Sequence, residues 1–165
     1  PDRKNVISWV SGMAAVRETV LFASDHQGSY KTGVKIAYGR ELYSQSVSFF
    51  SKLKRMGVEA KNFDSGNSKI VSSIIKEKKA DVIFAETVAN TPNMPVLDIP
   101  SLLEDLRREE NPPLVILDNT LPLKSGLDLS SELEPTDPVI VVESATKNAM
   151  NNYDLLGVSY GEIMI

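Results

Sequence analysis

An aspartate and a lysine that each follow a short apolar run are the residues of this sequence best suited to chemistry. Asp118 comes directly after the run 114–117, and Lys147 comes soon after the run 139–142. A lysine amine that is desolvated near the end of a buried strand is more readily neutral and therefore nucleophilic. The pattern predicts a reactive amine close to a carboxylate.

Hydroxyl groups and a helix start supply complementary hydrogen-bond donors. Ser144 and Thr146 lie beside Lys147, and the segment Ser11-Gly12-Met13 has the composition of a helix N-terminus. Such an N-terminus presents backbone N–H groups to a phosphate, and a glycine lets the phosphate approach closely. A carboxylate that faces a pyridine nitrogen keeps it protonated and makes the ring an electron sink. Together these groups are the set that pyridoxal 5'-phosphate (PLP) requires.

The segments that must position these groups alternate between strands and helices. The sequence predicts strands at residues 34–38, 58–63, 81–85, 114–117 and 139–142, and a last apolar segment at 155–165. Helical spacing of apolar residues marks helices around 13–20, 47–56, 70–75 and 102–106, with Ser101 as the expected cap of the last one. This alternation predicts a three-layer α/β/α fold with a mostly parallel sheet.

Parallel strands bring the residues that follow them to one edge of the sheet, where ligands of such folds bind. Glu86 and Asn90 follow the run 81–85, Asp118 follows the next run, and the segment 144–147 follows the one after it. We therefore expect these polar residues to share one site.

Four motifs, in their order and approximate spacing, resemble the Cys/Met-metabolism family of PLP-dependent enzymes. This family includes cystathionine γ-synthase, cystathionine γ-lyase, methionine γ-lyase and O-acetylhomoserine sulfhydrylase. The motifs extend over nearly the whole chain and are Ser11-Gly12-Met13-Ala14-Ala15, residues 86–90, Asp118-Asn119-Thr120 and Ser144-Ala145-Thr146-Lys147. The resemblance implies the cofactor-binding core of the aspartate-aminotransferase-like fold (fold type I), with PLP as the cofactor.

The resemblance also implies a role for each residue of the site. Catalysis would depend on Lys147, which carries the cofactor and moves protons, and on Tyr43, which stacks on the cofactor ring. The other cofactor contacts would come from the backbone amides of Gly12 and Met13, the hydroxyls of Ser144 and Thr146, the Asp118 carboxylate at the pyridine nitrogen, and Asn90 near the ring hydroxyl. Glu86 would be a nearby acid with a less direct role.

The implied activity is elimination or replacement at the β- or γ-carbon of a sulfur-containing or homoserine-derived amino acid, by a PLP-dependent lyase or transferase. Family members build their sites between subunits, so the resemblance implies a homodimer or homotetramer. The chain departs from the family at Val10, where a second serine is usual, and at 148–153, where a Gly-Gly-His stretch is usual. The loop after Asn90 is also about one residue longer. A domain that kept the fold and lost the activity is therefore an alternative.

Composition and length limit the remaining possibilities. The 165 residues suit one domain (1–165), and a first residue other than methionine with an apolar last segment suggests part of a longer chain. The net charge is −4 and the basic residues are scattered, which argues against a nucleic-acid partner. Cysteine is absent, which excludes thiolate metal sites and suits the cytoplasm, and no metal is expected. No apolar run reaches the length of a membrane span.

A response-regulator receiver domain is a second alternative, because residues 114–122 and 125–129 resemble the phospho-acceptor segment of that class. A receiver needs a pair of acids after its first strand to hold Mg²⁺, and the matching position offers only Asp64. It also needs its lysine after a further strand and helix, whereas Lys147 follows the very next strand. A dinucleotide-binding domain lacks support, since no glycine-rich loop follows an early strand.

Overall fold

A computed structural model describes residues 6–9, 11–26, 33–122, 129–144 and 161–164 of the chain. Its strands are β1 (Val6–Trp9), β2 (Lys35–Gly39), β3 (Glu59–Phe63), β4 (Val82–Glu86), β5 (Leu114–Asp118), β6 (Val139–Ser144) and β7 (Gly161–Met164). Its α-helices are α1 (Gly12–His26), α2 (Ser44–Arg55), α3 (Ser68–Lys76) and α4 (Ile99–Arg108), and a short 3₁₀ helix spans Leu129–Ser131. None of the helices in these described stretches is long and apolar enough to cross a membrane.

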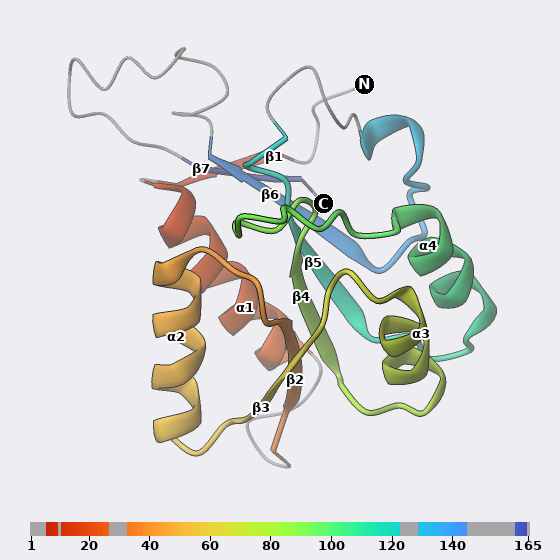
Figure 1. Ribbon diagram of the computed structural model, residues 1–165, viewed down its shortest axis with the longest axis horizontal. Coiled ribbons are helices and arrows are strands. Elements are labelled where there is room, and N and C mark those ends of the chain that lie inside the picture. The colour runs from red at the N-terminus through yellow and green to blue at the C-terminus, as the bar shows by residue number, and fades with distance from the viewer. Residues whose placement is uncertain (1–5, 10, 27–32, 123–128, 145–160, 165) are drawn as a thin grey trace.

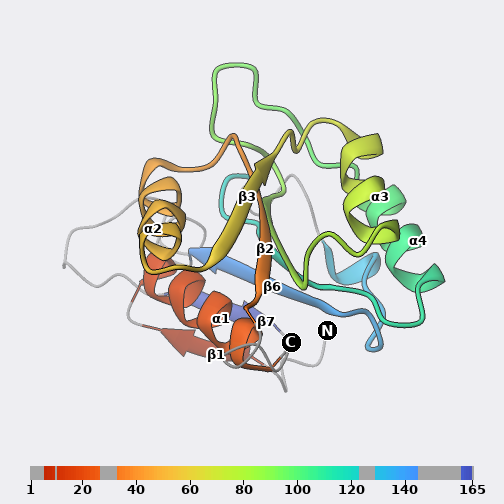
Figure 2. The ribbon, with the colours of Figure 1, turned by 90° about the horizontal axis from the view of Figure 1, so that it is seen from below.

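The strands form one mixed sheet in the order β1-β7-β6-β5-β4-β2-β3. Strands β3, β2, β4, β5 and β6 are mutually parallel, whereas β7 runs antiparallel to both of its neighbours, β6 and β1. Helices α1 and α2 cover one face of this sheet, and α3 and α4 cover the other (Figures 1 and 2). The predicted three-layer fold with a mostly parallel sheet is confirmed.

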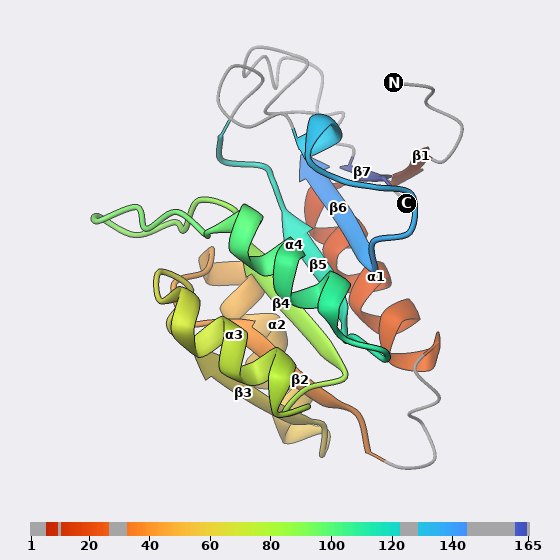
Figure 3. The ribbon, with the colours of Figure 1, turned by 90° about the vertical axis from the view of Figure 1, so that its right-hand side faces the viewer.

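Each face of the sheet has its own hydrophobic core. One core joins Ile36, Phe84, Ile116 and Val142 to α1 and α2, and the other joins Ala37, Ile83, Leu117 and Val141 to α3 and α4. Every residue of β4 is buried, as expected for a strand in the interior of a sheet covered on both sides. Figure 3, seen from the side of α3 and α4, shows these two helices lying against each other over the sheet.

The helix starts follow local capping chemistry. Ser11 Oγ accepts a hydrogen bond from the Ala14 N–H at 3.1 Å, which confirms the predicted cap of α1. The predicted cap of α4 was wrong: Asp98 is the capping residue, and its Oδ1 accepts from the Ser101 N–H at 3.2 Å. Pro100 is the reason, because proline is favoured in the first turn of a helix, where its missing N–H costs nothing.

The predicted strands correspond to β2 to β6 with small shifts at their ends. Strand β7 occupies part of the last apolar segment, and the rest of that segment, residues 155–160 and 165, lies outside the described residues. The sequence did not predict β1. This four-residue strand pairs with β7, whose residues lie near the other end of the chain.

An ion pair with a buried carboxylate group joins α4 to the loop that precedes β6. The Arg107 guanidinium donates from Nε to Asp137 Oδ1 at 2.9 Å and from Nη2 to Oδ2 at 2.7 Å. The Asp137 side chain is only 2% exposed, and that of Arg107 is 37% exposed. The hydrogen bonds from Arg107 hold the pKa of Asp137 below its ordinary value, against the opposing effect of burial.

Asp137→Asn is expected to lower the free energy of unfolding at pH 7 by about 1–2 kcal/mol, because a bidentate charged pair is lost but Arg107 stays partly hydrated. A carboxyl whose pKa is lower in the folded state stabilises the fold fully above its unfolded pKa of about 4, and this contribution is lost as the pH falls through the folded pKa. Urea unfolding should therefore show a smaller stability difference between the two proteins at pH 3 than at pH 7.

The exposed pair of Arg108 and Glu104 is the matched control for this measurement. Both side chains are more than half exposed, at 64% and 61%. Glu104→Gln should change stability by less than about 0.5 kcal/mol at either pH. An equal effect of the two substitutions would contradict the importance of burial at Asp137.

Candidate active site

The N-terminus of α1 lies directly against the end of β6. A Cβ atom added to Gly12 would lie 3.0 Å from Ser144 Cβ and 3.4 Å from Ser144 Oγ, so any larger residue would crowd Ser144. Ser11 already caps the Ala14 N–H, and the first N–H groups of a helix have no partner within the helix. The start of α1, with the backbone amides of Gly12 and Met13, and the nearby Ser144 hydroxyl together form a cradle suited to an anion.

Asp118, the last residue of β5, is connected to this cradle through Thr120. The Thr120 N–H donates to Asp118 Oδ1 at 3.0 Å, and the Ser144 N–H donates to Thr120 Oγ1 at 2.9 Å. No role was predicted for Thr120, although a hydroxyl just beyond a strand that ends in a candidate acid is a detectable signal. Thr120 thus links the end of β5 to the end of β6 by hydrogen bonds.

Glu86, the last residue of β4, is the Cα partner of Asp118 in the parallel sheet. It is 5% exposed, and its Oε1 accepts from the Tyr43 N–H at 2.6 Å while Oε2 accepts from the Asn90 N–H at 3.1 Å. Tyr43 is the N-cap residue of α2, and Asn90 is an exposed residue of the loop that follows β4. The structure therefore brings both residues to the same edge of the sheet as Asp118.

Strand alternation directs the acidic and hydroxyl side chains of this edge to one face. Phe84, Ile116 and Val142 belong to the core beneath α1 and α2. Side chains two residues further along a strand point to the same face, so Glu86, Asp118 and Ser144 lie on the side of α1 and α2. Three neighbouring strands thus present polar groups on the face of the sheet that α1 and α2 cover.

The opposite side of these strand ends carries a second polar network. Thr87 Oγ1 donates to Asn119 Oδ1 at 2.8 Å, and Asn119 Nδ2 donates to Glu143 Oε1 at 2.8 Å. Thr87 and Asn119 are buried, and each lies just beyond its strand. This network, which was not predicted from the sequence, links the ends of β4, β5 and β6 and so stiffens the edge that holds the candidate site.

The turn from β2 into α2 is anchored on both sides. Glu41 Oε1 accepts from Arg40 Nε at 2.9 Å, and Oε2 accepts from the Ser65 hydroxyl at 3.2 Å. Burial raises the pKa of the Glu41 carboxyl, but the hydrogen bonds from Arg40 and Ser65 outweigh this effect and hold the pKa below its usual value. With the Tyr43 N–H bound to Glu86, this turn has little freedom to move.

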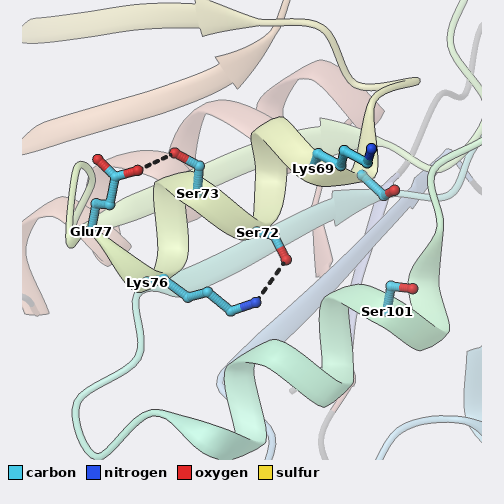
Figure 4. Close-up of a pocket in the computed structure, with 7 residues that line it drawn as sticks. Lys69, Ser72, Ser73, Lys76, Glu77 and Ser101 are labelled. Carbon is cyan, nitrogen blue, oxygen red and sulfur yellow. Dashed lines mark hydrogen bonds between the residues drawn. The ribbon is translucent and has the colours of Figure 1, made fainter.

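A surface cavity of about 460 Å³ lies away from this edge, beside α3 (Figure 4). Its side chains bond mainly with one another: Ser73 donates to Glu77 at 2.6 Å, and Lys76 donates to Ser72 at 3.3 Å. Lys76 also pairs with Asp105 of α4 at 2.9 Å. The cavity belongs to the layer of α3 and α4 and is separated from the α1 face by the sheet, so it is not part of the candidate site.

The arrangement of the described residues fits PLP. The cradle of Gly12, Met13 and Ser144 suits a phosphate, and the Asp118 carboxylate lies on the neighbouring strand, on the same face of the sheet. Thr146 and Lys147 follow Ser144 but lie outside the described residues.

The family model for Cys/Met metabolism PLP-dependent enzymes matches residues 2–157. The chain belongs to this family. PLP is the cofactor of the Cys/Met metabolism family, so the predicted family and cofactor are both confirmed. No curated protein matches the sequence.

Solved structures share the fold of this Cys/Met metabolism chain. O-acetylhomoserine sulfhydrylase of Wolinella succinogenes matches at 23% identity with a TM-score of 0.68, over 96% of this chain and 40% of that one. MetB of Corynebacterium glutamicum matches at 21% identity with a TM-score of 0.72, over 98% of this chain and 38% of that one. The third structure is cystathionine γ-synthase of Xanthomonas oryzae pv. oryzae in complex with aminoacrylate and cysteine. It matches at 18% identity with a TM-score of 0.71, over 96% of this chain and 37% of that one. The chain thus spans about two fifths of each structure, and the predicted fold type I core is confirmed.

The strand order removes the receiver-domain alternative. Asp64 follows β3, which lies at the edge of the sheet and is separated from β5 by β2 and β4. Three strand spacings correspond to about 14 Å, which is too far for Asp64 and Asp118 to hold one Mg²⁺ ion.

Proposed function

We propose that this chain binds PLP at the carboxyl edge of its parallel sheet and uses it for elimination or replacement at the β- or γ-carbon of a sulfur-containing or homoserine-derived amino acid. One observation carries the proposal: in a chain of this family, the N-terminus of α1 lies against Ser144 while Asp118 ends the adjacent strand. An anion cradle and a carboxylate on neighbouring strands match the two polar ends of the cofactor.

The residues of this edge would divide the work of binding. The Gly12 and Met13 amides with the Ser144 and Thr146 hydroxyls would hold the phosphate, and Asp118 would keep the pyridine nitrogen protonated. We propose that Tyr43 stacks on the ring and that Asn90 lies near the ring hydroxyl. Both assignments are supported by the hydrogen bonds from the backbone N–H groups of these residues to Glu86, which hold the two residues at this edge.

Lys147 would carry the cofactor through its amine and then, once the substrate has displaced it, move protons. When bound, PLP withdraws electrons from the substrate α-carbon. The Lys147 Nζ atom is the proposed base that takes a proton from that carbon and the acid that returns one. Taking that proton requires the amine in its neutral form, which desolvation of a lysine favours.

We further propose that the protein acts in the cytoplasm as a homodimer or homotetramer on a small amino-acid substrate, without a nucleic-acid or membrane partner. The lack of cysteine suits a reducing compartment. Family membership supports the subunit assembly, because members of this family complete their sites between subunits.

The test is direct attachment of the cofactor. Purified protein mixed with PLP should turn yellow, and borohydride reduction should add the mass of the cofactor to the peptide that contains Lys147. Lys147→Ala should abolish the adduct, whereas Lys69→Ala, at an exposed position on α3, should leave it intact. A colourless protein with no reducible adduct would show a domain that kept the fold without the chemistry.

A further inference from the structure

Glu86 joins two separate segments of the candidate site through one buried carboxylate. Its Oε1 accepts from the Tyr43 N–H at 2.6 Å, and its Oε2 accepts from the Asn90 N–H at 3.1 Å. Tyr43 precedes α2, and Asn90 lies in the loop beyond β4. Both donors are backbone N–H groups, so Glu86 fixes the positions of these segments whatever side chains they carry.

A carboxylate is the side chain that this position requires. Two N–H donors converge on it from different segments, and an ionised carboxyl accepts through both oxygens. A glutamine of the same shape has one acceptor oxygen and an NH₂ group, which would oppose one of the two N–H donors. A carboxylate that is only 5% exposed is costly unless it is well hydrogen-bonded, and bonds to an ionised acceptor are about twice as strong as neutral ones.

The position of Glu86 in the sheet makes this clamp rigid. The residue ends β4, is flanked by β2 and β5, and is paired in register with Asp118. Immediately beyond it, the Thr87 N–H donates to the Asp118 carbonyl oxygen at 3.0 Å. The carboxylate is therefore held by the most buried part of the sheet, and the two loops are held by the carboxylate.

We propose that Glu86 is a positioning residue of the cofactor site, which sets the separation of Tyr43 and Asn90 before the cofactor binds. This proposal rests on the proposed function, in which Tyr43 and Asn90 contact the cofactor. The clamp itself is a property of the cofactor-free protein and is measurable there.

Glu86→Gln tests the clamp by amide hydrogen exchange in the cofactor-free protein. Exchange of the Tyr43 amide, the Asn90 amide or both should become about tenfold faster, because at least one charge-assisted bond is lost. The dissociation constant for PLP should rise by about tenfold, since the two segments would have to be ordered on binding. Glu86→Asp keeps the charge and both oxygens with a shorter reach, and should give smaller changes of the same sign.

Asp105→Asn is the matched control, because it also removes the charge of a buried carboxylate. Asp105 is 6% exposed and accepts from Ser72 and Lys76 between α3 and α4. It should lower thermal stability as Glu86→Gln does, yet leave PLP affinity and the exchange at Tyr43 and Asn90 at wild-type values.

The possible results separate this inference from the proposed function. Unchanged exchange at both amides in Glu86→Gln would overturn the clamp, and faster exchange with wild-type PLP affinity would reduce Glu86 to a purely structural residue. A wild-type protein that binds no PLP would instead refute the proposed function and, with it, the assignment of the clamp to a cofactor site. Failure of Glu86→Gln to fold leaves the decision to Glu86→Asp, in which unchanged exchange and affinity would equally overturn the proposal.

Discussion

Asp118→Asn is expected to lower kcat of the intact protein on the order of 100-fold, the effect typical of removing one preorganised charge from an active site. Asparagine has the shape of aspartate but no charge, so it cannot keep a pyridine nitrogen protonated. Its Oδ1 can still accept the bond that Asp118 Oδ1 accepts from the Thr120 N–H at 3.0 Å. The free energy of unfolding should therefore change by less than about 1 kcal/mol.

The measurement is turnover and urea unfolding of both proteins, saturated with PLP. Asp137→Asn serves as the control, since it is the same chemical change at a buried carboxylate far from this edge, and it should lower stability without lowering kcat. Full activity in Asp118→Asn would show that the carboxylate does not face the pyridine nitrogen.

Gly12→Val is expected to weaken PLP binding on the order of 100-fold, because phosphate held by several backbone and hydroxyl donors accounts for a large part of the affinity. The added Cβ atom would lie 3.0 Å from Ser144 Cβ, tighter than ordinary contact, and valine adds two methyl groups beyond it. The N-terminus of α1 must then move away from β6, and the cradle opens.

Gly57→Val is the matched control, because Gly57 has a φ of +93°, a conformation in which valine is strained. Gly57 lies between α2 and the start of β3, at the opposite end of the strands from Ser144. Both variants should lose stability, and only Gly12→Val should lose affinity in a titration followed by absorbance. Equal affinities in the two variants would place the phosphate somewhere other than the start of α1.

Some parts of the fold and site were predictable because their causes are local. The run 81–85 is apolar throughout, which indicates a strand buried on both faces, and Ser11 lies where its hydroxyl can cap the Ala14 N–H. The order and approximate spacing of the four motifs predicted the family, which the family model confirms. The local pattern at Ser101 led to the wrong helix cap. The helix begins before Ser101, with Pro100 in its first turn, and Asp98 is the cap.

The sequence by itself determined the alternation of strands and helices, the family and the identity of the candidate acids and hydroxyls, because these depend on neighbouring residues. Only the tertiary structure decided that β1 pairs with β7 and that Gly12 lies against Ser144, since both contacts join residues far apart in the chain. The same holds for the binding of Tyr43 and Asn90 by Glu86. The sequence shows that Glu86 has a carboxylate, which can accept hydrogen bonds from two N–H donors. Which donors reach it depends on the order of the strands in the sheet.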